Sequence, residues 1–133
     1  MKREDLDALH FITPIANVLS ILTHGIMSHR RATKLPHQSI AMAEIQDRRQ
    51  KVVIPNARPL HEYVNLYICA RNPMMYRRQA EHRSIKCAEV LVPDRVDASC
   101  ITSAYVSGSE GQEALLAVAP GLAVTVYGYM FFR

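Results

Sequence analysis

The sequence predicts an α+β fold in which helices and strands are mixed without a regular βαβ order. The stretch FITPIANVLSILTHGI carries apolar residues at helical spacing, whereas LYICA, CAEVLVP and LAVTVYGYMFF are short apolar runs typical of strands. The sequence contains no glycine-rich phosphate loop, which argues against a doubly wound sheet. A length of 133 residues suits one hydrophobic core, so we expect residues 1–133 to form a single domain.

The first helix is expected after Thr13, which caps it, with Pro14 in its first turn. Gly25 is expected to end this helix. Its apolar face consists of Ile15, Val18, Leu19, Leu22 and Ile26. The basic run SHRRATKLPH that follows is expected to form a loop.

A second helix is expected to begin at Ser39, its cap, and to bury Ile40 and Ala43, with Ile45 as a further candidate. Later in the chain we expect a short strand at 52–54, a turn at 55–59 and a buried strand at 66–70. Asn72 and Pro73 predict the start of a short helix that carries Met74, Met75 and Tyr76.

The last third of the chain predicts three strands and one helix. The strands are expected at 87–93, 101–106 and 122–132. Ser109 and Gln112 have the spacing of a capping box, so a helix is expected to begin there and run through EALLAV.

Positive charge is concentrated in the first two thirds of the chain. The net charge is +4, and residues 1–86 hold 14 Lys and Arg against 7 Asp and Glu. From Cys87 onward the balance reverses to 2 against 5. An arginine-rich part favours an anionic partner such as nucleic acid or a nucleotide, although a generic solvated surface accounts for the charge equally well. The same two readings apply to Arg48 and Arg49, which close the second helix.

Several classes of protein and site are not expected. The N-terminus, MKREDLDALHF, has acids where a signal peptide is apolar, and no apolar run approaches the roughly 20 residues of a membrane span. We therefore expect a cytoplasmic protein without a membrane partner. Three scattered cysteines and six histidines show no CxxC or HExxH spacing, so we expect no metal site and no disulfide.

Two patterns suggest chemistry. Glu89 lies in an otherwise apolar strand, where its carboxylate points either to the outer face or into a cleft suited to acid–base work. Tyrosines are interleaved with arginines in the middle of the chain, a pattern that suits single-stranded nucleic acid because bases stack and phosphates pair. These residues are Tyr63, Tyr67, Tyr76, Arg71, Arg77 and Arg78. His29 with Arg30 and Arg31 is a further candidate for contact with phosphate.

Four stretches, in order, resemble the DarT family. FITPIANVLSILTHGI is similar to its opening helix, and SIAMAEIQDRR to its S-I-A-x-x-x-I-Q-x-R-R helix. RPLHEYVNLYICARNPMMY resembles its L-H-D-Y-V-x-x-Y-x-x-x-R-x-P-M-x-Y block. CAEVLVPDRV resembles the A-E-x-L-V segment that carries the family's catalytic glutamate.

The resemblance implies an activity. DarT proteins are DNA ADP-ribosyltransferases that move ADP-ribose from NAD to a base in single-stranded DNA, typically thymine. They act as toxins paired with a macrodomain antitoxin, DarG, and share the mixed α/β fold of mono-ADP-ribosyltransferases around a central antiparallel or mixed sheet. For this chain the resemblance therefore implies NAD as co-substrate, single-stranded DNA as target and DarG as partner.

The resemblance also implies site residues. Catalysis is expected from Glu89 and Arg49. The cofactor is expected to contact His10, Phe11, Thr13, Asn17, Ser39, Ile40 and Arg49, with nicotinamide held near Thr13. The DNA is expected to contact Arg48, His61, Tyr63, Arg71, Met74, Tyr76, Arg77 and Arg78. Gln46 falls in the same family blocks.

This chain departs from the family in its centre and at Phe11. Many members carry His where Phe11 stands, and here His10 lies one place earlier. Only RRQAEHRSIKC separates Tyr76 from Ala88, where the family has a long segment with a further strand and two loops. The chain is a shortened form, a degenerate relative that binds without transferring, or a sequence that lacks a segment of its parent. We expect weak or absent transfer from the 133-residue form.

Two other functions stay open. One is a non-catalytic module on the same scaffold that binds single-stranded nucleic acid or an antitoxin. The other is a transferase that acts on RNA or protein, because a shared scaffold does not fix the acceptor.

Overall fold

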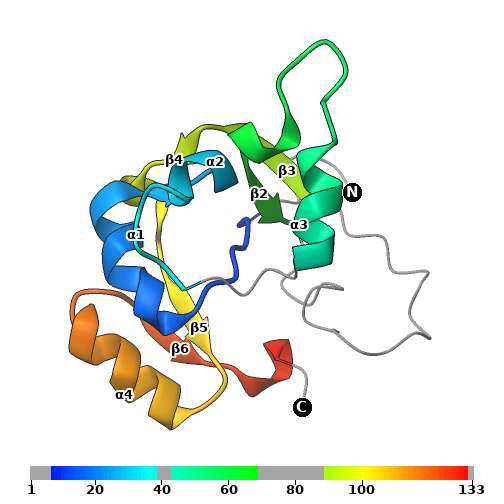
Figure 1. Cartoon of the computed structure of the whole chain (residues 1–133). Coiled ribbons are helices and arrows are strands. Elements are labelled where there is room, and N and C mark those ends of the chain that lie inside the picture. The colour runs from blue at the N-terminus through cyan, green and yellow to red at the C-terminus, as the bar shows by residue number, and fades with distance from the viewer. Residues whose placement is uncertain (1–6, 39–42, 69–88, 132–133) are drawn as a thin grey trace. The chain divides into compact units, whose positions relative to one another are not determined.

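Short helices and three two-stranded sheets make up the part of the chain that the computed structural model describes, residues 7–38, 43–68 and 89–131 (Figure 1). Strand β1 (Ile26–Met27) pairs antiparallel with β4 (Arg95–Val96). Strand β2 (Tyr63–Tyr67) pairs with β3 (Glu89–Pro93), and β5 (Ala104–Val106) pairs in parallel with β6 (Val124–Val126). The mixture confirms the predicted α+β class.

The chain divides into two compact units. The α1 unit comprises Thr13–Asn65 and Leu91–Thr102. The α4 unit comprises Met1–Ile12, Leu66–Val90 and Ser103–Arg133. Each is described by itself.

The α1 unit begins with the predicted helix. A 3-10 turn, η2 (Ile15–Asn17), leads into α1 (Val18–His24), and Gly25 ends it with φ 86° while its N–H donates to the Ile21 carbonyl. The predicted cap was wrong: Pro14 is the N-cap residue of η2 and makes no side-chain hydrogen bond. Ile26 lies in β1 and not on the helix face, because Gly25 turns the chain before it.

The basic run after β1 contains a short helix, α2 (His29–Ala32), where a loop was predicted. The Ser28 hydroxyl accepts a hydrogen bond from the Arg31 N–H at 3.4 Å, and Ser28 is buried. A serine at this position satisfies a free N–H group of the first turn, which is why the helix begins there.

The second predicted helix is α3 (Ala43–Gln50). Its expected start, Ser39 with Ile40, lies outside the described residues. Ala43 is exposed, so its predicted burial was wrong.

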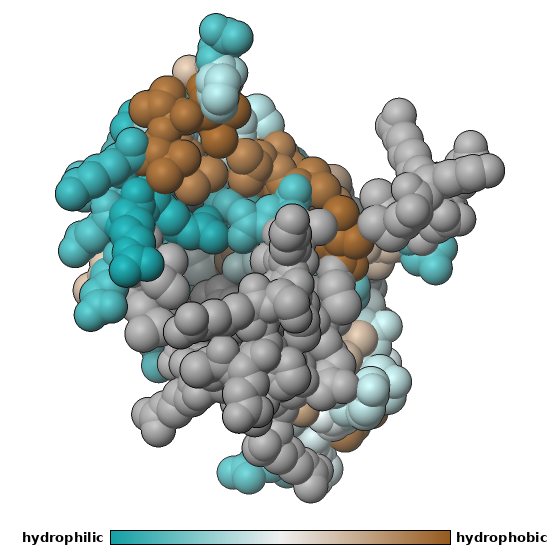
Figure 2. Space-filling view, turned by 90° about the vertical axis from the view of Figure 1, so that its right-hand side faces the viewer, coloured by the Kyte–Doolittle hydropathy of each residue, from teal (hydrophilic) through white to brown (hydrophobic). Residues whose placement is uncertain are grey.

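The strand predicted at 52–54 was also wrong, because only Val53 forms a bridge there, with Pro59. Val53 is 59% exposed, and Figure 2 shows exposed hydrophobic side chains at the top of that view, next to hydrophilic ones. The turn predicted at 55–59 is confirmed: the Ile54 N–H donates to the Arg58 carbonyl at 3.0 Å, and Asn56 adopts φ 57°. Asparagine tolerates this left-handed conformation better than most residues.

A 3-10 turn, η3 (Leu60–Glu62), leads into β2, which begins three residues before the predicted strand at 66–70. Among the described residues of the α1 unit, the buried apolar side chains are Val64, which is 2% exposed, and Ile26, which is 8% exposed. Residues 69–70, the helix predicted at 72–76 and the first two residues of the strand predicted at 87–93 lie outside the described residues. A further 3-10 turn, η5 (Ala98–Cys100), follows β4.

In the α4 unit, α4 (Ser109–Val118) packs on β5 and β6 (Figure 1). Leu115 is 2% exposed and Val106 is buried, while the Gln112 amide donates to the Val124 carbonyl at 3.4 Å. The predicted capping box was wrong: Gly108 is the N-cap, and Ser109 is the first residue of the helix.

Both C-terminal strands are shorter than predicted. β5 occupies half of the range expected at 101–106, and β6 is followed by the turn η6 (Gly128–Met130). In the same unit, His10 and Tyr67 exchange two backbone hydrogen bonds of 2.8 Å. No helix within the described residues is both long enough and apolar enough to cross a membrane.

Gly25 generates a stability prediction. A Cβ at this position would meet the Val96 carbonyl oxygen at 2.3 Å, and φ is 86°, so Gly25→Ala combines a backbone clash with a strained conformation. We expect the substitution to lower the free energy of unfolding by about 1–3 kcal/mol, measured by urea denaturation. Gly121→Ala is the control, because a Cβ there meets nothing within 4 Å. Equal unfolding midpoints for the two variants would contradict the prediction.

Candidate functional site

A cavity of about 330 Å³ lies in the α1 unit. Its walls come from α2, α3 and the segment around η3, and its lining consists of His29, Arg30, Thr33, Gln46, Asp47, Gln50, Pro59 and His61. His29 and Thr33 lie one helical turn apart, as do Gln46 and Gln50, so each helix turns one face to the cavity. The volume is at the lower end of the range for small-molecule sites, which suits one ring-sized group.

Two imidazole rings stand together in this lining. The ring centroids of His29 and His61 are 4.1 Å apart, with the ring planes inclined by 36°. Burial lowers the pKa of His61, and the charges of His29, Arg49 and Arg30 lower it further. The pKa of His29 is also lowered, by burial and then by His37. Both rings are therefore predominantly neutral at pH 7, and a neutral imidazole offers one donor and one acceptor nitrogen.

Two polar atoms of the lining are buried without a partner. Among the described residues, neither Oε1 of Gln46 nor Nε2 of His61 has a hydrogen-bond partner. A buried polar atom left unpaired costs about 1–3 kcal/mol, so such atoms call for an explanation, and a bound ligand is one.

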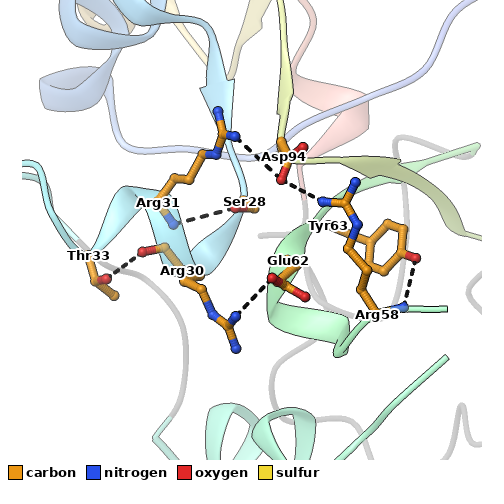
Figure 3. A network of polar contacts seen from close by, with 8 residues as sticks. All are labelled: Ser28, Arg30, Arg31, Thr33, Arg58, Glu62, Tyr63 and Asp94. Carbon is orange, nitrogen blue, oxygen red and sulfur yellow. Dashed lines mark hydrogen bonds and ion pairs between the residues drawn. The ribbon is translucent and has the colours of Figure 1, made fainter.

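Ion pairs link two of the segments that carry this lining, α2 and the region around η3 (Figure 3). Nη1 of Arg30 lies 2.8 Å from Oε1 of Glu62, which joins α2 to η3. Oδ1 of Asp94 lies 2.8 Å from Arg58 and 3.5 Å from Arg31. One carboxylate therefore links α2 with the turn before η3.

The backbone of Asp94 strengthens this link. Its N–H donates to the Glu62 carbonyl at 2.9 Å, and its carbonyl accepts from the Ser28 N–H at 2.8 Å. The residue adopts φ 64°, a conformation that Asp tolerates and most residues with a Cβ avoid. The Asp94 turn thus fixes the start of α2 against the end of η3.

The residues predicted to bind the cofactor fall in both units. In the α1 unit, the Asn17 side chain donates to the Gln38 carbonyl at 2.7 Å and accepts from its N–H at 2.8 Å. The same amide donates to the Thr13 hydroxyl at 3.3 Å. Asn17 therefore joins the predicted nicotinamide segment to the chain just before Ser39. In the α4 unit, His10 is half-buried and Phe11 is 40% exposed.

The residues predicted to bind DNA are partly in view. His61 lines the cavity, Arg48 is exposed in the last turn of α3, and the Tyr63 hydroxyl accepts from the Arg58 N–H at 3.4 Å. The others lie outside the described residues, as do the cofactor candidates Ser39 and Ile40. They are Arg71, Met74, Tyr76, Arg77 and Arg78.

The two predicted catalytic residues belong to different units. Arg49 is half-buried in the last turn of α3, and its charge acts on His61. Glu89 is the half-buried first residue of β3 and belongs to the α4 unit. Their roles stay predictions. Within the described residues, no group of three or more His, Cys, Asp or Glu side chains is placed to hold a metal ion.

Four lining residues were not expected from the sequence. They are Thr33, Asp47, Gln50 and Pro59. Gln50 had a usable signal, because it follows Gln46 by one helical turn and shares its face. Thr33 had none, because a loop and not a helix was expected after His29. Pro59 had none either, because it lies in the predicted turn and meets the two helices from a distant part of the sequence.

The family model described as "ssDNA thymidine ADP-ribosyltransferase, DarT" matches residues 10–85. A DNA ADP-ribosyl transferase-DNA ADP-ribosyl glycohydrolase fusion protein of Thermosipho africanus (strain H17ap60334) is 40% identical over 74 residues, 52% of this chain and 18% of that protein. Across the curated relatives, the match spans between 18% and 34% of their length.

Solved structures confirm the predicted ADP-ribosyltransferase-like fold. Thermus sp. 2.9 DarT in complex with ADP-ribosylated ssDNA has a TM-score of 0.79 at 20% identity, with 99% of this chain and 100% of that chain covered. The same Thermus protein in complex with NAD+ has a TM-score of 0.71 at 17% identity, with 96% and 98% covered. At these identities the likeness establishes the fold.

The histidine pair generates a prediction of pH dependence. The pKa values of His29 and His61 lie below the ordinary 6.5, so the unfolded chain binds these protons more readily than the folded protein. The two neutral histidines therefore make their full contribution to the free energy of unfolding above pH 6.5, and this contribution is lost as the pH falls below 6.5. We expect His61→Gln to flatten the fall of the thermal midpoint between about pH 7 and about pH 5.5. His24→Gln is the control, and equal pH profiles for the two variants would refute the prediction.

Asp94 generates a second prediction. Asp94→Asn keeps the shape and the tolerated φ but removes both ion pairs, which are partly exposed. We expect it to lower the free energy of unfolding by about 1 kcal/mol at low salt, and by less in high salt, where exposed charges are screened. Asp7→Asn, on an exposed segment, is the matched control. A loss that high salt leaves unchanged would argue against an ionic origin.

Proposed function

The chain belongs to the DarT family, whose model matches residues 10–85, and we propose that it transfers ADP-ribose from NAD to a thymine base in single-stranded DNA. The family match carries the proposal. The Thermus DarT structures that share the fold hold NAD+ in one case and ADP-ribosylated ssDNA in another, which supports the same two molecules here. The positive charge of residues 1–86 supports a polyanionic target, because basic side chains attract the phosphate backbone.

Glu89 and Arg49 carry the proposed chemistry. NAD supplies an activated ribose, whose bond to nicotinamide breaks while a new bond forms to the base. The Glu89 carboxylate orients a ribose hydroxyl and the incoming base, and it accepts the proton that the base loses. The Arg49 guanidinium holds the pyrophosphate or stabilises charge on the base through its planar fork of donors.

Further residues bind and position the substrates. We propose that Thr13 and the backbone around it hold nicotinamide, with Asn17 fixing that segment through its bonds to Gln38 and Thr13. Arg48, Tyr63 and His61 contact the DNA strand, by charge for the arginine and by stacking for the rings. With a short segment between Tyr76 and Ala88, we expect slower transfer than in a longer relative.

The proposed partner is a protein that removes the modification. The Thermosipho relative is a fusion of a DNA ADP-ribosyl transferase with a DNA ADP-ribosyl glycohydrolase, so the two activities occur in one chain there. We propose that this chain is the toxin of such a pair and that a macrodomain antitoxin of the DarG type opposes it. We propose that it acts on DNA in the cytoplasm.

Removal of the Glu89 carboxylate tests the reaction. We expect Glu89→Gln to reduce labelled DNA by at least about 100-fold, because it removes the general base and keeps the side-chain shape. We expect Arg49→Lys to reduce it by roughly 10-fold to 100-fold, because lysine keeps the charge but loses the fork. The assay follows transfer from labelled NAD to a mixed-sequence single-stranded oligonucleotide.

Glu113→Gln supplies the matched control. It makes the same chemical change on an exposed residue of α4 and is expected to leave transfer unchanged. Full transfer by Glu89→Gln would remove Glu89 from the mechanism. If the wild-type chain binds the oligonucleotide and gives no labelled product, the transferase proposal fails and the binding-module function takes its place.

A further inference from the structure

The cavity between α2 and α3 has an unusual hydrogen-bonding character. Oε1 of Gln46 accepts only, whereas Nε2 of His61 donates or accepts, and among the described residues both atoms are buried without a partner. A molecule that satisfies both presents an N–H group to Gln46 and a second polar atom to His61. Nucleobases and carboxamides carry such adjacent groups on a flat, uncharged edge.

The charges around the cavity argue against a phosphate as its occupant. Arg30 lines the cavity, but its guanidinium is directed to Glu62 at 2.8 Å (Figure 3). Asp47 adds a carboxylate to the lining, which would repel a phosphate. The nearby Arg49 already takes part in another interaction. A phosphate would also favour charged imidazoles, whereas His29 and His61 are kept predominantly neutral by burial and by neighbouring positive charge.

The shape of the cavity favours a ring. The two imidazoles, whose ring centroids are 4.1 Å apart, both belong to the lining, and Pro59 adds an apolar ring. The volume of about 330 Å³ suits a single ring with its substituents and is small for a whole dinucleotide.

We propose that this cavity binds the hydrogen-bonding edge of an uncharged ring group, with Gln46 accepting an N–H from it and His61 completing the second hydrogen bond. The inference rests on the proposed function, because single-stranded DNA brings such an edge as a nucleobase and NAD brings one as the carboxamide of nicotinamide. The first source agrees with nicotinamide held near Thr13, and the second would move the carboxamide from Thr13 to this cavity. It makes Gln46 and His61 recognition residues and not catalytic ones.

Gln46→Met tests this inference with two readouts. Methionine has a similar length but needs no hydrogen bond, so it removes the buried unpaired acceptor. We expect the thermal midpoint of the free protein to rise by about 2–4 °C. We expect binding of the correct probe to weaken about tenfold. A purely structural glutamine gives the opposite result for stability, because its loss removes a hydrogen bond.

Three probes identify the source of the edge, each titrated into the full chain at fixed salt. They are a thymidine oligonucleotide, an abasic oligonucleotide of the same length, and nicotinamide. If Gln46→Met lowers the affinity for the thymidine oligonucleotide alone, the cavity binds a base. If it lowers the affinity for nicotinamide alone, the cavity binds the carboxamide. An equal loss with the abasic strand, or no loss with any probe, overturns the proposal.

Gln112→Met is the matched control. It makes the same substitution at an amide that donates to the Val124 carbonyl, so it is expected to lower the thermal midpoint and leave all three affinities unchanged. The outcomes also separate the two proposals. If binding of a probe depends on Gln46 but no labelled DNA forms, the transferase proposal fails and this inference stands. If Gln46→Met changes neither the rate of transfer at limiting substrate nor any of the three affinities, this inference fails and the transferase proposal stands.

Discussion

The turn at Asp94 is the constraint on which the α1 unit depends. Its carboxylate pairs with Arg31 and Arg58, while its backbone N–H and carbonyl bond to Glu62 and Ser28. The ion pairs are partly exposed and contribute little individually, but the backbone bonds fix where α2 begins and where η3 ends. Because the cavity is lined from those two elements and from α3, this one turn holds two of its three walls against each other. A residue that tolerates φ 64° is needed there.

Local signals in the sequence predicted the helices better than the strands. The first helix and its stop at Gly25 followed from spacing and from one glycine, both of which act within a few residues. The strand at 52–54 failed because Val52 and Val53 have high β propensity but, within the described residues, only an isolated bridge from Val53 to Pro59, and propensity alone does not create a partner strand. The caps at Thr13 and Ser109 were wrong by one residue, at Pro14 and Gly108.

The candidate site also contains residues that local sequence predicts and residues that it does not. Glu89 and Arg49 were assigned by resemblance to a family, and their motifs lie in continuous stretches of sequence. The cavity was not predictable, because its lining comes from residues 29–33, 46–50 and 59–61, which meet through contacts distant in sequence. Its two unpaired atoms show what sequence patterns miss. Gln46 and His61 match family blocks, but only the structure reveals that each has a buried polar atom without a partner among the described residues.

The pairing of β1 with β4 has a consequence for how the protein is made. It joins Ile26 to Val96, so about 70 residues lie between the two strands, and contacts of such separation form slowly. On the ribosome, Arg49 and the cavity residues emerge well before the Asp94 turn that joins α2 to η3. The segment from β5 to β6, in contrast, joins residues about 20 apart and closes soon after it is synthesised. The unit that carries Arg49 therefore acquires its native order late in translation, although most of its residues are made first.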